Sequence, residues 1–311
     1  MKLRVALALI LIVCLTIPAS SRPLLKQNDE GEQPQLTTEE EQAARALALK
    51  FATGLRETDG DIEPLVQQFF VSDFDELLRS KECHSDMPYN WAYIALDPAL
   101  IPQLNNKELR RLYVTIIQLF YLHMTKIMPR YIAESEDDES GGQIEDAIPP
   151  EIVSLVKNDP TFSALYHEWK MREAAKQTRV DARAEAETNG LRLNEIAGAG
   201  DVEEHDSAEA IVTTIKQVQA LLTLGDKLIE AMYRYSAVHP APPELADRAN
   251  SEIEIDEPHL TVIDKETCGR PKETRFICVH IEVFTDVQFY LELESVGGEL
   301  KIIRLMPVAG D

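Results

Sequence analysis

Histidine, cysteine and acidic side chains gather at a few places in the sequence, and each place imitates a known kind of site. His167 and Glu168 begin the H-E-x-x-H pattern of zinc proteases, but Met171 stands where the second histidine ligand is needed. Cys83 precedes His84, yet a thiolate–imidazolium pair needs a spatial geometry that adjacency does not supply. We therefore expect a surface histidine at the first motif and a structural or oxidised cysteine at the second.

Two acidic stretches imitate metal-binding loops without completing them. Asp137, Glu139 and Gly142 match part of a calcium loop, but Ile148 falls where that loop needs a bidentate glutamate. Residues 203–206 are Glu-Glu-His-Asp, and four contiguous side chains do not converge on one ion unaided. The sequence also contains no G-x-S-x-G, P-loop or Rossmann glycine pattern. We therefore predict no metal and no cofactor, and the catalytic residues, if any exist, are unknown.

The overall composition limits the class of protein. The chain has 311 residues, 44% of them hydrophobic, and 31 Lys and Arg stand against 54 Asp and Glu, for a net charge of −23. This hydrophobic content is typical of folded proteins rather than of disordered ones. Because contacts to phosphate need clustered Lys and Arg, the acidity argues against nucleic acid and anionic membranes as partners.

The first 21 residues have the layout of a secretory signal peptide. A short basic start precedes an almost unbroken apolar run over residues 5–17, and cleavage could follow Ala19 or Ser21. An uncleaved anchor is the alternative, but this run is shorter than the roughly 20 residues that span a bilayer. We predict an exported protein, periplasmic or extracellular, with no membrane span once residues 1–21 are removed.

Three cysteines follow the predicted signal peptide. Disulfides persist in exported proteins, and Cys268 and Cys278 flank a turn-like segment, residues 269–272. The two could face each other across a hairpin, so a Cys268–Cys278 disulfide is a possible pairing if their Cα atoms come within about 7 Å. Cys83 would then be the odd thiol.

Hydrophobic spacing divides the rest of the chain into a helical part and a C-terminal sheet. Residues 22–36 read as a flexible lead, and six segments have helical patterns: 38–57, 61–70, 73–78, 107–128, 148–169 and 207–239. The first is expected to begin at a capping box of Thr38 and Glu41. The fourth is apolar around most of its circumference, so we expect it to be central and buried. Four alternating segments predict strands: 260–263, 276–284, 289–295 and 300–306. The predicted fold class is α+β, with N-terminal and central helices packed on a C-terminal four-stranded antiparallel sheet.

The last predicted hairpin has a clear register. A Gly297-Gly298 turn would pair Glu294 with Lys301, which have opposite charges, and would pair two apolar residues in the next position. Those apolar partners are Leu293 and Ile302.

The preceding hairpin has two alternatives. A two-residue loop, 285–286, would place His280 and Glu282 on one face with Phe289 and Arg304, as a polar site in an apolar wall. A three-residue loop, 285–287, would move His280 and Glu282 to the opposite, polar face. Register follows the hydrophobic pattern, so we favour the second arrangement, in which Arg304 is the one charged residue on the apolar face.

Two parts of the sequence are similar in residue pattern to one superfamily. Residues 39–55, 61–66 and 69–74, which contain EEEQAA, FATGL, DIEPLV and FFVSDF, resemble the opening helix pair of nuclear transport factor 2-like (SnoaL-like) proteins. Residues 289–305, FYLELESVGGELKIIRL, resemble their final hairpin. The resemblance implies a cone of helices against a curved sheet, with a pocket. It transfers no activity, because members include enzymes, binders and scaffolds.

The resemblance also implies a domain organisation. Residues 37–80 and 251–308 would together form the cone-like α+β domain. The mostly helical residues 84–238 would be an insertion much longer than the family usually has, with mobile segments near 134–142 and 190–206.

Several side chains could line or guard such a pocket. Trp91 and Tyr93 could line it, although anchoring of a core is the alternative. Arg304 could hold a ligand carboxylate, pair with an internal carboxylate or reach water at a sheet edge. Three acids could act in acid/base chemistry at its mouth, or could simply favour a helix N-terminus: Asp73, Asp75 and Glu76.

No catalytic pattern is complete, so we expect an exported, acidic, non-enzymatic protein that binds a small molecule or contacts another protein. The alternative is a pocket enzyme of isomerase or hydrolase type that uses a single carboxylate or His as general acid/base. A third hypothesis treats residues 84–238 as a separate partner-binding module. A homodimer is a possible assembly, and no motif identifies the ligand or partner.

Overall fold

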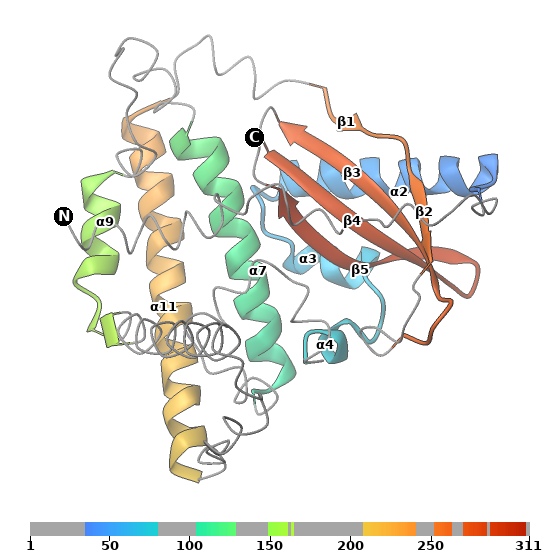
Figure 1. Ribbon diagram of the computed structural model, residues 1–311. Helices are drawn as coiled ribbons and strands as arrows, with labels where there is room; N and C mark the ends of the chain where they lie inside the picture. Colours follow the sequence, from blue (N-terminus) through green and yellow to red (C-terminus); the bar gives the residue numbers. More distant parts are fainter. Residues whose placement is uncertain are drawn as a thin grey trace, which may run out of the picture.

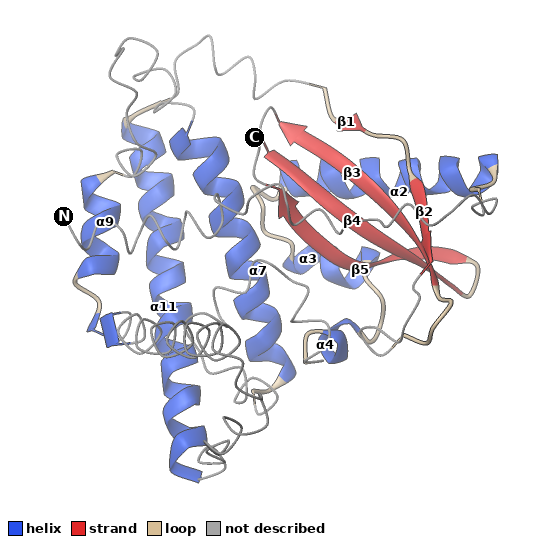
Figure 2. Ribbon diagram, in the orientation of Figure 1, coloured by secondary structure: helices blue, strands red, loops and turns tan. Residues whose placement is uncertain are grey.

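The computed structural model describes residues 35–79, 104–128, 149–160, 163–164, 208–240, 252–262, 270–284 and 287–308. Helices α7, α9 and α11 form one side of the molecule, and the sheet lies on the other side with helices α2 and α3 behind it (Figure 1). Figure 2 shows the same division between a purely helical side and a mixed side. The predicted α+β fold class is confirmed.

Six α-helices and one π-helical turn are described: α2 (Thr38–Glu57), α3 (Glu63–Phe69), α4 (Phe74–Leu77), α7 (Asn106–Leu122), η3 (His123–Ile127), α9 (Pro150–Lys157) and α11 (Ala208–Val238). Helix α2 begins at a capping box of Thr37 and Glu40, one residue before the predicted pair of Thr38 and Glu41. The run TTEEE offers the same Thr-x-x-Glu spacing in both registers, so the pattern alone does not distinguish them. None of the described helices is both long and apolar enough to cross a bilayer.

Five strands form one antiparallel sheet: β1 (Glu254–Ile255), β2 (His259–Val262), β3 (Arg275–Phe284), β4 (Val287–Val296) and β5 (Glu299–Val308). Strands β3, β4 and β5 pair in succession, and both β1 and β2 pair with the other edge of β3. The prediction of four strands is therefore corrected to five in the described part of the chain. Strand β1, the strand that was not predicted, is only two residues long.

The two faces of the sheet differ as the favoured arrangement predicts. Ile281 lies opposite Phe289, and both side chains are fully buried. His280 lies opposite Tyr290 on the other face, and both are only partly buried. We call the apolar side, which packs on the helices, the inner face, and the side that carries His280 and Tyr290 the outer face.

The loop between β3 and β4 is shorter than the favoured three residues, since Phe284 pairs with Val287. A β-bulge between Glu282 and Phe284 shifts the register by one residue, and this shift keeps the apolar side chains on the inner face. The guanidinium of Arg56 on α2 donates to the carbonyl of Val283 at 2.7 Å and lies 4.4 Å from the Phe284 ring. A contact from a distant helix therefore supports the bulge.

The last hairpin has the predicted turn and register. Gly297 and Gly298 have φ of +61° and +88°, as a type I′ turn requires. Leu293 pairs with Ile302, which confirms the predicted register next to the turn.

A second bulge lies farther along this hairpin, opposite Glu292 and Leu293. It inserts Ile303 into β5, so that Arg304 pairs with Glu292 on the outer face. The prediction that Arg304 lies on the apolar face is wrong, because one extra residue reverses the alternation of every side chain after it.

The edge of β5 that faces away from β4 makes hydrogen bonds at two points with other parts of the protein. These contacts limit pairing of this edge with a strand of another chain. The backbone N–H of Val71 donates to the carbonyl of Ile302 at 3.0 Å. The hydroxyl of Tyr113 on α7 donates to the carbonyl of Leu305 at 2.8 Å. Burial raises the pKa of Tyr113, so its hydroxyl keeps its proton and remains a donor.

Helices α2, α3 and α4 and one side of α7 fill the inner face with aromatic rings. Phe70 lies 6.0 Å from Phe51 and 4.6 Å from Phe74, centroid to centroid, in edge-on contacts. Phe120 of α7 meets Phe289 of β4 at 5.6 Å, also edge-on. All five rings are buried. We call this cluster the inner core.

The opposite side of α7 belongs to a second core with Leu104, α9 and α11. At Gly225 of α11 an added Cβ would lie 2.5 Å from Cγ2 of Thr115, so α7 and α11 approach closely there. Because α7 contributes buried residues to both cores, its predicted central and buried position is confirmed.

Candidate functional site

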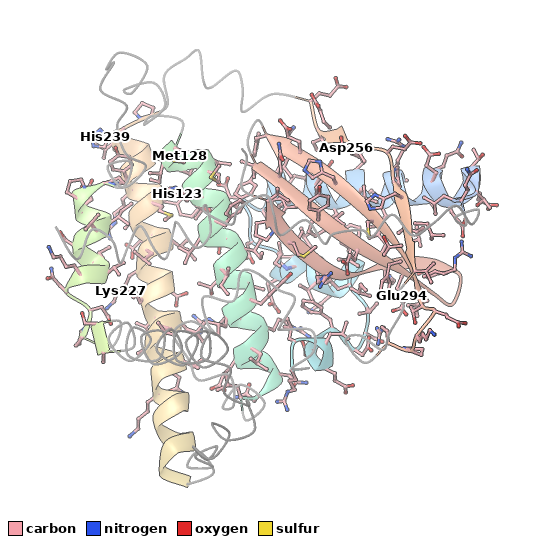
Figure 3. The ribbon with its side chains drawn as sticks, in the orientation of Figure 1. His123, Met128, Lys227, His239, Asp256 and Glu294 are labelled. Carbon is pink, nitrogen blue, oxygen red and sulfur yellow. The ribbon has the colours of Figure 1, made fainter. Side chains whose placement is uncertain are left out.

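A hydrogen-bonded network crosses the outer face of the sheet. Nδ1 of His280 lies 2.7 Å from a carboxylate oxygen of Asp256, the residue that follows β1. Nε2 of the same ring lies 3.2 Å from Oε1 of Gln288, and Gln288 Nε2 donates to Glu282 at 3.1 Å. The Tyr290 ring lies 4.8 Å from the His280 ring. The network therefore joins β1, β3 and β4, and Figure 3 labels Asp256 at its β1 end.

The partners of Gln288 determine what His280 can do chemically. Glu282 accepts from the Gln288 amide nitrogen, so the amide oxygen faces His280. Both ring nitrogens of His280 thus lie within hydrogen-bond distance of side-chain oxygens, Nδ1 of Asp256 and Nε2 of Gln288. Because neighbouring side chains already engage both nitrogens, the arrangement suits a fixed polar surface better than a general base.

An ion pair of Arg304 and Glu292 lies beside this network on the same face. Both side chains are 16% exposed, so the pair is largely shielded from water and stays ordered. Arg304 therefore has an internal carboxylate as its partner, which is one of the alternatives given above, although the carboxylate comes from a strand.

Cys278 lies on the outer face, with its sulfur 3.5 Å from the hydroxyl of Thr261. Burial raises the pKa of the Cys278 thiol to about 11, so it is protonated and a weak nucleophile at neutral pH. Cys278 forms no disulfide with any residue that the structure describes. Cys268 lies outside them, so the Cys268–Cys278 disulfide stays a prediction.

The acids at the start of α4 are held by arginines. Asp73 accepts from two nitrogens of Arg270, at 2.8 and 3.2 Å, and Arg270 also donates to Glu294 at 2.9 Å. Asp75 accepts from two nitrogens of Arg110 on α7, at 2.8 and 2.7 Å. The hydrogen bonds from Arg270 lower the pKa of Asp73, which stays ionised at neutral pH. These ion pairs connect the start of α4 to Arg270, which precedes β3, and to Arg110 of α7. The two carboxylates therefore serve to hold α4 in place rather than to transfer protons. The third acid, Glu76, is exposed.

Several predicted site residues lie outside the described residues, and nothing in the structure tests them: Cys83, His84, Trp91, Tyr93, residues 137–142, His167, Glu168, residues 203–206 and Cys268. Within the described ranges, no group of three or more His, Cys, Asp or Glu side chains is arranged to hold a metal ion.

The pairing of His280 with Asp256 is the feature that sequence reasoning missed. The alternation Glu252-Ile253-Glu254-Ile255-Asp256 is a period-two signal, and β1 is the part of it that pairs with β3. This signal could have identified a strand next to β3, but not which residue of β3 it meets.

Comparisons with known proteins do not place the chain in a family. No protein-family model matches the sequence, and comparisons with curated proteins and with solved structures give no match.

Proposed function

We propose that the protein is an exported, non-catalytic protein that works by contacting another protein through the outer face of its sheet. The observation that carries this proposal is the contrast between the two faces. The inner face is filled by the protein's own side chains, with Phe289, Leu291 and Leu293 fully buried. The outer face carries partly exposed polar and aromatic side chains, among them His280 and Tyr290, that are held in fixed positions.

The fixed positions on the outer face favour binding. His280, Tyr290 and Arg304 each have a partner that holds them. A side chain already ordered in the free protein loses less conformational entropy when a partner covers it. Tyrosine and arginine are also enriched where proteins bind each other. The outer face thus combines residue types that are common in protein interfaces with side chains that lose little conformational entropy on binding.

The alternative of a pocket enzyme has less support. Its candidate acids, Asp73 and Asp75, are each held by an arginine, and both ring nitrogens of His280 are engaged. A pocket of the nuclear transport factor 2-like kind would lie on the inner face of the sheet, where the aromatic rings of the inner core pack. We keep the superfamily relationship as a proposal supported by the helices that cover one face of an antiparallel sheet.

Native mass spectrometry of the chain recovered from outside the cytoplasm tests the proposal. We expect the mass of a chain that begins at Ser20 or Arg22, because cleavage follows Ala19 or Ser21. We also expect that no small molecule is retained. A ligand of defined mass that survives purification would contradict the filled inner face and favour the pocket alternative. A chain that keeps residues 1–21 would contradict export by a cleaved signal peptide.

A further inference from the structure

His123 is a buried titratable side chain that the outer face does not use. It begins η3, the π-helical turn that continues α7, and its side chain is 1% exposed. Neither ring nitrogen has a hydrogen-bond partner in the part of the chain that the structure describes. Figure 3 places His123 at the end of α7 beside α11. Buried polar groups nearly always have a partner, so this ring is an exception that needs a reason.

Buried apolar residues flank His123 in the chain. The neighbouring residues Leu122 and Ile127 belong to the second core, as do Leu228 and Met232 of α11. Burial lowers the pKa of His123 to about 4, so the ring is neutral at pH 7. A proton on this ring would create a buried charge without an acceptor, which is strongly unfavourable until the ring reaches water.

The charged groups on the elements around His123 are engaged elsewhere or exposed. Lys126 of η3 pairs with Asp59 at 3.1 Å. On α11, Asp226 pairs with Arg111 of α7 at 2.6 Å. Of the other titratable groups on α11, Glu230 pairs with Arg234, Lys216 and Lys227 are exposed, and Tyr233 lies near Asp59. The ring of His239, which follows α11, lies against Tyr235. Glu151 and Lys157 of α9 are exposed.

We propose that His123 makes the contact between α7–η3 and α11 sensitive to acid, so that protonation releases α11 while the sheet and the inner core stay folded. The separation of the two cores supports a local event. The buried residues of α11 lie in the second core, and the sheet packs in the inner core, so α11 can move without exposing the inner face. This proposal does not depend on the proposed function.

The direction of the effect follows from linkage. The open state has an ordinary histidine pKa near 6.5, and the closed state has the lowered value. The open state therefore binds more protons, and opening becomes easier as the pH falls below about 6.5 until the closed state also titrates. At pH 5.0 the opening equilibrium should be roughly 10- to 30-fold more favourable than at pH 7.5.

Hydrogen–deuterium exchange of residues 22–311 at pH 7.5 and 5.0 tests the proposal. After correction for the intrinsic exchange rate, protection in α11 should fall by about 10- to 30-fold, while β3, β4 and β5 keep theirs. His123→Leu should remove this pH response. His239→Gln, at the residue that directly follows α11 and is only partly buried, should retain it. Equal loss of protection in α11 and in the sheet would overturn the proposal, as would a full response in His123→Leu.

A second measurement covers the case in which His123→Leu does not fold. Exchange of the imidazole C2 hydrogen, followed by mass spectrometry of the wild-type protein, reports the titration of each histidine. His123 should titrate between about pH 4 and 5. A midpoint near 6.5 would show that the ring is not buried and would overturn the proposal.

Discussion

Replacing Phe289 with alanine is expected to lower the free energy of unfolding by about 3–5 kcal/mol. Phe289 is fully buried on the inner face and meets the Phe120 ring edge-on at 5.6 Å. Alanine would leave a cavity between β4 and α7 in the middle of the inner core. Urea unfolding at pH 7, followed by circular dichroism, measures the change.

The neighbouring residue provides the matched control. Tyr290 is the next residue of β4, but its ring lies on the outer face against His280. Tyr290→Ala should therefore cost less than about 1.5 kcal/mol, because little apolar surface is removed from the interior. Similar losses for the two variants would mean that both faces are core, and the outer face would not be free to bind.

Gly60→Ala is expected to destabilise the protein by about 3 kcal/mol or more. Gly60 follows α2 with φ of +82°, a conformation that costs alanine about 1 kcal/mol or more. An added Cβ would also lie 2.5 Å from Cβ and from Cγ of Tyr121, a ring that is 1% exposed and cannot move aside freely. The turn after α2 and the helix α7 would have to separate.

Gly297→Ala separates the two contributions. Gly297 also has a positive φ, +61°, but nothing lies within 4 Å of the added Cβ. Gly297→Ala should therefore lower the free energy of unfolding only by the cost of placing alanine at a positive φ, about 1 kcal/mol. Thermal unfolding of both variants gives the comparison. If Gly60→Ala loses no more than Gly297→Ala, the close approach of Gly60 to Tyr121 is not present in solution.

The sequence predicted the positions of the helices and strands better than the register in which the strands pair. Hydrophobic spacing located the helices and the three long strands, except that the helix predicted over residues 148–169 ends at Lys157 as α9. The Gly297-Gly298 turn set the register of Leu293 with Ile302. The two bulges were not predictable from local pattern, and each lies beside a contact from a distant part of the chain. Arg56 of α2 holds the carbonyl of Val283, and the N–H of Val71 bonds Ile302 next to the inserted Ile303.

The same limit applies to the candidate site. Alternation correctly placed His280 and Glu282 on the polar face. Their connection to Asp256 depends on which residues of β3 pair with β1, a long-range register that local alternation does not give. The position of Arg304 was predicted incorrectly for one reason, the bulge at Ile303. Local sequence thus indicates which residues share a face until the first bulge, and long-range pairing decides the rest.

Photo-crosslinking from the outer face tests the central claim most directly. A photoreactive phenylalanine derivative would replace Tyr290 in the exported protein, and a second variant would carry it at Leu49. Leu49 is 47% exposed on α2, which lies behind the sheet in Figure 1. We predict a discrete crosslinked protein of defined mass from position 290 and none from position 49. No crosslink from position 290, or equal crosslinking from both positions, would contradict the account.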